Sequence, residues 1–157
     1  MIVSYRCRGF TLLELMIVIV MVGVLLGMVS FAGGGSPARQ VRQEAEAMVQ
    51  VIHQLRERAV FEGQEYGLRL STDGHRVMRK EAHGWEPVGE LTDWPLSVRL
   101  RLQLDGYWVA LDADEGPPQL LMFSNDETSV FTLTFESSNR NWLSLSGDGL
   151  SEVAIDG

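Results

Sequence analysis

Residues 10–32 form an almost unbroken apolar run, FTLLELMIVIVMVGVLLGMVSFA, in which Glu14 is the only charged residue. As a helix, these 23 residues would be about 35 Å long, enough to cross a hydrocarbon core of about 30 Å. Arg6 and Arg8 precede the run, so the positive-inside rule predicts a cytoplasmic N-terminus. Residues 30–32 also fit a signal peptidase site, but an ordinary secretory core is only about 7–15 residues long. The pattern therefore predicts a single-pass anchor.

A short glycine-rich stretch, residues 33–36, follows the apolar run. Each glycine costs a continuous helix about 1 kcal/mol relative to alanine, which predicts a hinge formed by Gly33, Gly34 and Gly35 together with Pro37.

The polar pattern after the hinge predicts a second helix over residues 37–61. Ser36 is expected to cap it and Pro37 to occupy its first helical position. Apolar residues at spacings of four and three place one stripe on this helix: Val41, Ala45, Met48, Ile52, Leu55 and Ala59. One face is therefore expected to be buried against the domain that follows.

Beyond residue 62 the apolar period changes from that of a helix to that of a strand. Residues 96–104 alternate strictly between apolar and polar. Within residues 130–136, Phe131, Leu133 and Phe135 fall on one side of a strand, with Thr132 and Thr134 opposite. Turn signals such as Asp73-Gly74 and Asp105-Gly106 bound shorter candidate strands at 66–70, 76–80, 107–111, 120–123, 142–145 and 153–155. About eight short strands with hairpin-length connections predict an α+β fold, with antiparallel sheets or a β-sandwich at 62–157 packed on the second helix.

The junction before the apolar run carries a recognisable motif, Arg8-Gly9-Phe10-Thr11-Leu12-Leu13-Glu14-Leu15. It resembles the leader of type IV pilins and pseudopilins. The resemblance implies that prepilin peptidase removes residues 1–9 by cutting between Gly9 and Phe10, and that the new amine of Phe10 is N-methylated. It also implies that Glu14 pairs with the ammonium group of a neighbouring subunit. Unpaired charges inside a bundle of apolar helices are costly, so this ion pair would set the register between subunits.

A long helix followed by an all-β head resembles the GspH-type minor pseudopilins of the type II secretion system. The resemblance implies an inner-membrane subunit with a periplasmic head at 37–157. It would join other pseudopilins in a fibre, contact neighbouring subunits or secreted proteins through its head, and take part in export across the outer membrane. Two alternatives stay open: a type IV pilus minor pilin for pilus assembly or DNA uptake, and a membrane-anchored periplasmic module that binds glycans or secreted proteins.

Composition narrows the possible partners. The chain has 21 acidic and 13 basic side chains, a net charge of −8, so it offers no global positive field to attract nucleic acid. Cys7 is the single cysteine, which excludes an intramolecular disulfide. The four tryptophans are expected in the core of a small β domain rather than on sugar-binding platforms: Trp85, Trp94, Trp108 and Trp142.

The head carries no common catalytic signature. The sequence contains no G-x-S-x-G, H-E-x-x-H, G-x-x-x-x-G-K-[ST] or C-x-x-C motif, so neither an enzyme nor a cofactor is expected. Asp112, Asp114 and Glu115 gather three carboxylates within five residues, a weak candidate for calcium. The spread of these ligands is narrower than that of a calcium loop, so a solvated acidic turn without metal is the expectation.

Overall fold

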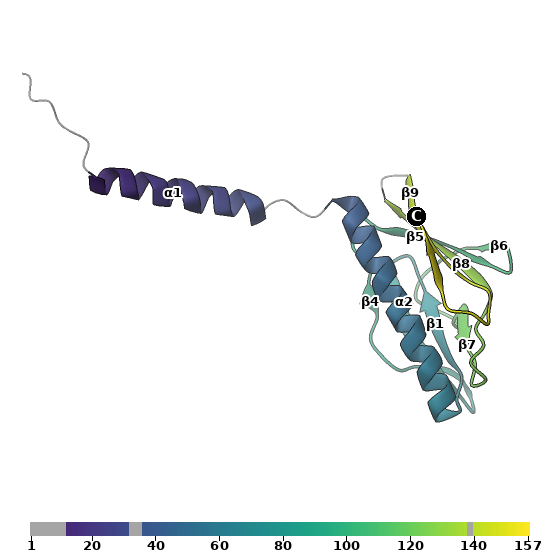
Figure 1. The fold of residues 1–157 in the computed structure, drawn as a ribbon. Coiled ribbons are helices and arrows are strands. Elements are labelled where there is room, and N and C mark those ends of the chain that lie inside the picture. Colours follow the sequence, from purple (N-terminus) through teal and green to yellow (C-terminus); the bar gives the residue numbers. More distant parts are fainter. Residues whose placement is uncertain (1–11, 32–35, 138–139) are drawn as a thin grey trace, which may run out of the picture. The chain divides into compact units, whose positions relative to one another are not determined.

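The computed structural model describes the backbone of residues 12–31, 36–137 and 140–157, and the side chains of 12–22, 36–137 and 143–157. The chain divides into two units, Met1–Gly35 and Ser36–Gly157. Figure 1 shows the elements of each unit along the chain. The predicted cleavage site at Gly9 and Phe10, and the predicted hinge glycines at 33–35, lie outside the described residues.

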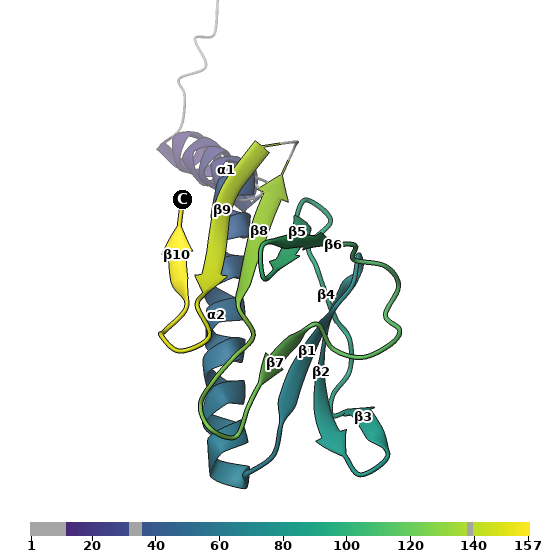
Figure 2. The same cartoon turned by 90° about the vertical axis from the view of Figure 1, so that its right-hand side faces the viewer.

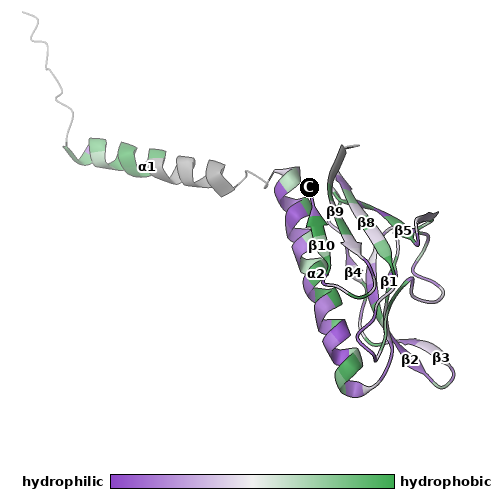
Figure 3. Cartoon of the chain, turned by 45° about the vertical axis from the view of Figure 1, so that its right-hand side comes forward, coloured by the Kyte–Doolittle hydropathy of each residue, from purple (hydrophilic) through white to green (hydrophobic). Residues whose placement is uncertain are grey.

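The first unit contains helix α1, Leu12–Phe31, within the predicted apolar segment. Its sequence is apolar apart from Glu14, which lies in the first turn. Figure 3 shows the described part of α1 mostly in the colour of hydrophobic residues. Within the described residues, no helix has both the length and the hydropathy needed to cross a membrane.

The second unit begins with helix α2, Pro37–Glu62, one residue longer than predicted. Pro37 takes the first helical position, as expected. The expected side-chain cap is wrong: Ser36 makes no side-chain capping bond. Its carbonyl instead accepts from the backbone N–H groups of Arg39 (2.8 Å) and Gln40 (3.2 Å). The helix ends at Gly63, whose φ of 64° is the left-handed conformation that glycine adopts without strain.

The predicted apolar stripe of α2 is its buried face. All six of its residues are at most 5% exposed: Val41, Ala45, Met48, Ile52, Leu55 and Ala59. Each fully buried valine, leucine, isoleucine or methionine side chain contributes about 1.5–3 kcal/mol relative to an exposed one. Packing on the sheets therefore stabilises α2 far more than helix propensity does.

Sheet A contains strands β1 to β4 and strand β7. Its order is β3-β2-β1-β7, with β4 pairing on the other part of β2, and all of its strand pairs are antiparallel. The bounds are β1 Tyr66–Leu70, β2 Gly74–Glu81, β3 Gly84–Pro87, β4 Thr92–Asp93 and β7 Leu120–Met122.

Sheet B contains the other five strands in the order β10-β9-β8-β5-β6, again antiparallel throughout. Both sheets lie on the same side of α2, sheet B along its N-terminal part and sheet A along its C-terminal part (Figure 2). The bounds are β5 Arg99–Leu104, β6 Tyr107–Val109, β8 Phe131–Ser137, β9 Arg140–Gly147 and β10 Ala154–Asp156.

One core joins α2 to both sheets. Leu68 of β1, Leu102 of β5 and Leu133 of β8 are fully buried with the α2 stripe. The predicted α+β class, with a long helix packed on antiparallel sheets, is confirmed.

Two details of the strand prediction are wrong. The strand predicted at 96–104 begins only at Arg99, because Pro95 accepts a turn hydrogen bond from Val98 and Leu96 projects fully into solvent. Strands β3 and β4 were not predicted, since they are short and do not alternate. Gly74 explains β4: a Cβ there would collide with the carbonyl of Thr92, so only glycine lets this strand approach β2.

Candidate functional site

Glu14 places a carboxylate in the first turn of α1 among apolar side chains. The adjacent residues Leu13 and Leu15 are 69% and 55% exposed in the chain. Negative charge is favoured at a helix N-terminus, where backbone N–H groups point outward. The first turn of α1 therefore stabilises the charged form of a carboxylate at this position.

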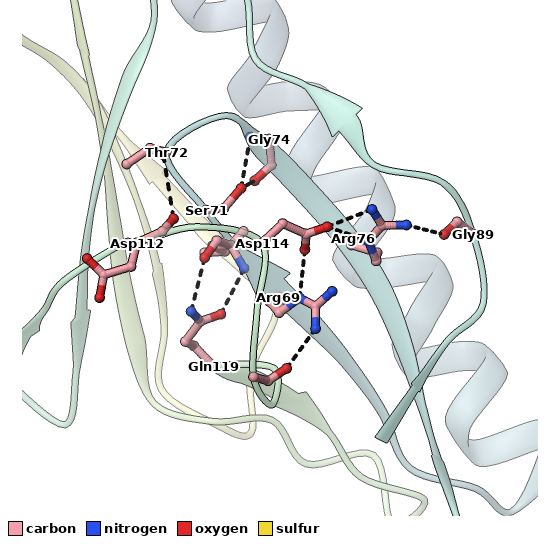
Figure 4. Close-up of polar contacts among 11 residues, drawn as sticks. Arg69, Ser71, Thr72, Gly74, Arg76, Gly89, Asp112, Asp114 and Gln119 are labelled. Atoms are coloured by element: carbon pink, nitrogen blue, oxygen red, sulfur yellow. Dashed lines mark hydrogen bonds and ion pairs between the residues drawn. The ribbon is translucent and has the colours of Figure 1, made fainter. Parts of the chain in front are cut away.

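The acidic turn between β6 and β7 has a structural role that the sequence did not reveal. Asp114 accepts hydrogen bonds from Arg69 Nε at 2.7 Å and Arg76 Nε at 2.7 Å, and Arg76 Nη2 lies 2.6 Å from the same carboxylate (Figure 4). Arg69 and Arg76 face each other across the β1–β2 ladder. Like charges directly opposite each other destabilise a sheet, so Asp114 neutralises a repulsion built into β1 and β2.

Further contacts fasten the same connection to sheet A (Figure 4). Arg69 Nη1 donates to the Gly116 carbonyl at 2.7 Å, and Gln119 makes two hydrogen bonds with the main chain of Leu70. The backbone N–H of Thr72 donates to the Asp112 carbonyl at 3.1 Å. The β6–β7 connection, which carries the chain from sheet B to sheet A, is thus held along its length.

This geometry bears on the calcium candidate at Asp112, Asp114 and Glu115. Hydrogen bonds from Arg76 and Arg69 lower the pKa of Asp114, although burial alone would raise it. Both oxygens of that carboxylate already face guanidinium groups, so Asp114 does not offer a ligand to a cation. Within the described residues, no three His, Cys, Asp or Glu side chains gather in a group that could hold a metal.

Arg56 is a buried cation that fastens α2 to two loops of the head. Its side chain is 11% exposed. Nη2 donates to the Asp126 carbonyl at 2.8 Å and to the Leu150 carbonyl at 3.2 Å, and Nη1 donates to the Ser151 carbonyl at 2.8 Å. Nε also bonds the Asp126 carboxylate at 3.2 Å. The planar guanidinium is suited to several fixed acceptors at once.

Sequence reasoning missed Arg56, although a signal was present. It lies four residues after Ile52 and three before Ala59, which places it within the buried stripe of α2. A buried cation requires several acceptors, and the loops at Asp126 and Leu150 supply them.

The tryptophans divide between core and surface. Trp94 is 8% exposed and donates its indole N–H to the Ser71 carbonyl at 3.0 Å, as a core residue does. Trp108 is 55% exposed, so its predicted core position is wrong. Trp85 is half-buried, and the side chain of Trp142 lies outside the described residues.

Comparisons with known proteins agree at the level of motif, whole chain and fold. Residues 4–30 match the prokaryotic N-terminal methylation motif. Type II secretion system protein H of Pseudomonas aeruginosa is 38% identical over 160 residues, covering 90% of this chain and 91% of that protein. The protein of the same name from Aeromonas hydrophila is 26% identical, covering 87% and 85% of the two chains.

Two solved structures share the fold. The minor pseudopilin EpsH from the type II secretion system of Vibrio cholerae has a TM-score of 0.67 at 20% identity, covering 78% of this chain and 99% of that one. The solution structure of Escherichia coli GspH has a TM-score of 0.63 at 19% identity, covering 76% and 89%. With the 38% identity to the Pseudomonas protein along nearly the whole of both chains, these results establish that the chain belongs to the type II secretion system protein H family, the GspH-type minor pseudopilins.

Proposed function

We propose that this minor pseudopilin is matured by prepilin peptidase between Gly9 and Phe10, with methylation of the Phe10 amine. Residues 10–32 then hold it in the inner membrane with the head, residues 37–157, in the periplasm. From there it enters the secretion pseudopilus as a structural subunit without catalytic activity. The observation that carries this proposal is the position of Glu14 at the start of an apolar helix, inside a segment that matches the N-terminal methylation motif.

The proposed role of Glu14 is to select the register of assembly. Cleavage after Gly9 creates an ammonium group at Phe10, roughly one helical turn before Glu14. When α1 packs among similar helices, the Glu14 carboxylate of one subunit and the amine of its neighbour each lose solvation. They offset this cost only in the register that brings them together, so the ion pair favours one axial arrangement of subunits.

The proposed hinge at Gly33, Gly34 and Gly35 gives the head freedom to orient against its neighbours while α1 stays in the fibre or the membrane. Three consecutive glycines interrupt helical continuity at a cost of about 1 kcal/mol each relative to alanine. The two-unit division of the chain, with its boundary at residues 35 and 36, supports a joint at this place.

Intact-mass and N-terminal analysis of the protein from its native membrane tests maturation. We expect a chain that starts at methylated Phe10. A start at Met1 or at Gly33 would remove the basis for the proposed ion pair, because neither places an amine one turn before Glu14.

Substituting Glu14 tests assembly separately from maturation. In Glu14→Leu we expect normal membrane insertion and cleavage but at least about a hundredfold less co-purification with the other pseudopilins, the loss expected when one partner of a buried ion pair is removed at a cost of about 3–5 kcal/mol. Met16→Leu is the matched control, since it alters the same helix without changing charge. Unchanged co-purification of Glu14→Leu would contradict the ion-pair role.

A further inference from the structure

Sheet B ends in a short open edge at β6. Strands β5 and β6 form a hairpin through Asp105 and Gly106, whose φ values of 50° and 83° are those of a type I′ turn. Among the strands of the described residues, β6 pairs only with β5 and is the last strand of sheet B (Figure 2). In such a hairpin, hydrogen-bonded and non-hydrogen-bonded pairs alternate from the turn outward, so Trp108, opposite Gln103, directs its backbone N–H and carbonyl away from β5.

Two aromatic side chains stand on this edge. Tyr107 is 78% exposed and Trp108 is 55% exposed. The guanidinium carbon of Arg101, on β5, lies 4.0 Å from the centre of the Trp108 ring. This stacking holds a cation directly above the edge strand and keeps the Trp108 ring oriented.

A groove of about 700 Å³ follows this edge. Its walls come from β5, from β6 with residues 110–111, and from Ser71 and Thr72, which follow β1. Arg99 lines it together with Arg101. The groove is therefore bounded by strand backbone, an indole ring and two guanidinium groups.

The charged side chains that line this groove are positive, whereas the net charge of the chain is negative. Arg101 lies 3.3 Å from the Glu136 carboxylate. Arg99 is exposed, and although its main chain pairs with Glu136 of β8, its side chain forms no hydrogen bond or ion pair with any residue that the structure describes. In a chain of net charge −8, the charged side chains that line the groove itself are the two arginines. Asp73 and Asp93 lie with Arg99 in the adjoining hollow, so the positive charge is confined to the lining of the groove. An acidic ligand complements it.

We propose that the β6 edge binds an extended, acidic segment of a partner protein by strand addition. The segment pairs its main chain with that of Trp108, stacks apolar side chains against Tyr107 or Trp108, and places carboxylates against Arg99 and Arg101. Main-chain pairing supplies affinity, and the arginines supply the preference for acidic side chains. Because β6 has only three residues, the added segment is short. This proposal goes beyond the assembly role of Glu14 and does not depend on it.

Binding of fluorescein-labelled peptides to the purified full chain in detergent micelles tests the proposal. The probe is a short peptide of alternating valine and glutamate. Its binding is measured by fluorescence anisotropy. We expect saturable binding that weakens as salt is raised, since exposed charges are screened beyond about 8–10 Å. The same peptide with lysine in place of glutamate should bind at least about tenfold more weakly.

Variants on the chain and on the probe separate the components of binding. Arg99→Glu and Trp108→Ala should each weaken binding about tenfold. Arg39→Glu is the matched control for charge: Arg39 is also exposed, makes no side-chain ion pair with a described residue, and lies on α2. N-methylation of alternate amides in the peptide should weaken binding by a similar factor, because it removes main-chain donors.

Several results would overturn the proposal. Equal binding of the valine-lysine peptide, or unchanged binding by Arg99→Glu, would show that acidic side chains are not recognised. Full binding of the N-methylated peptide would exclude strand addition. Self-association of the chain that Trp108→Ala abolishes would make β6 an interface between copies, and binding of neutral sugars in place of the peptide would make Trp108 a glycan platform.

Discussion

The apolar side chains of α1 and α2 differ in their exposure to solvent. In α2 the six stripe residues are at most 5% exposed, because both sheets cover them. In α1 the apolar side chains from Leu12 to Val22 are 47% to 79% exposed. The amphipathic helix has its apolar partner within the chain, whereas a helix that is apolar all round needs one from outside, either lipid or other helices.

Because of this difference, substitutions can change the free energy of unfolding of the head and the free energy of insertion and assembly independently. Residues of α2 contribute to the free energy of unfolding of the head, Ser36–Gly157. Residues of α1 contribute to insertion and assembly. Substitutions on the two helices should therefore give different readouts even when the side chains are identical.

The largest expected effect is that of truncating the buried stripe. Ile52→Ala, at a fully buried position, should lower the free energy of unfolding of the head by about 2–5 kcal/mol, because it leaves a cavity between α2 and the sheets. Urea denaturation followed by tryptophan fluorescence measures it. Ile17→Ala, at a 53% exposed position on α1, should leave that free energy within about 0.5 kcal/mol. Equal losses of unfolding free energy in both variants would contradict the assignment of α2, and not α1, to the stability of the head.

The next effect concerns the carboxylate between Arg69 and Arg76. Asp114→Asn should lower the free energy of unfolding at neutral pH by about 1.5–3 kcal/mol, since charge-assisted hydrogen bonds are lost and two arginines then face each other unneutralised. Asp112→Asn is the control, because the exposed Asp112 contributes only its carbonyl to the hydrogen bonds of this turn.

The same variant has a predicted pH dependence. The pKa of Asp114 in the folded head is lowered below its ordinary value of 3.8 by the hydrogen bonds from Arg76 and Arg69. Its contribution is therefore complete above that ordinary value and is lost as pH falls through the lowered folded value. Unfolding free energies of wild type and Asp114→Asn should converge as pH falls below about 4. A pH-independent difference between them would contradict this assignment.

A somewhat smaller effect is expected at Arg56. Arg56→Met keeps much of the side-chain volume but removes the donors to the Asp126, Leu150 and Ser151 carbonyls. We expect a loss of about 1–3 kcal/mol in the free energy of unfolding. Arg56→Lys should recover only part of it, because an ammonium group does not reach several fixed acceptors at once. Arg42→Met, which breaks only an exposed pair with Glu46, should cost about 0.5 kcal/mol or less.

The sequence predicts those parts of the molecule that follow from local period and composition. The α2 stripe was predicted because burial on one face imposes a period on the chain, and the bounds of β1 were predicted because turn signals delimit that segment. The contacts of Asp114 and Arg56 were not, because they join residues 45 and 70 positions apart along the chain. Such contacts depend on strand order and register, which no local pattern specifies. The same holds for Trp108, whose exposure follows from the position of β6 at the edge of sheet B.

The smallest expected effect on the free energy of unfolding is that of a substitution at Ser36, where α2 begins. A serine that caps a helix through its side chain contributes about 1 kcal/mol, but Ser36 binds Arg39 and Gln40 through its carbonyl, which any residue supplies. Ser36→Ala should therefore change the free energy of unfolding by less than about 0.5 kcal/mol. Gly63→Ala at the opposite end, where φ is 64°, should cost about 1 kcal/mol or more, because a Cβ is strained in the left-handed conformation. If the serine variant loses as much as the glycine variant, the hydroxyl of Ser36 does cap α2 in solution.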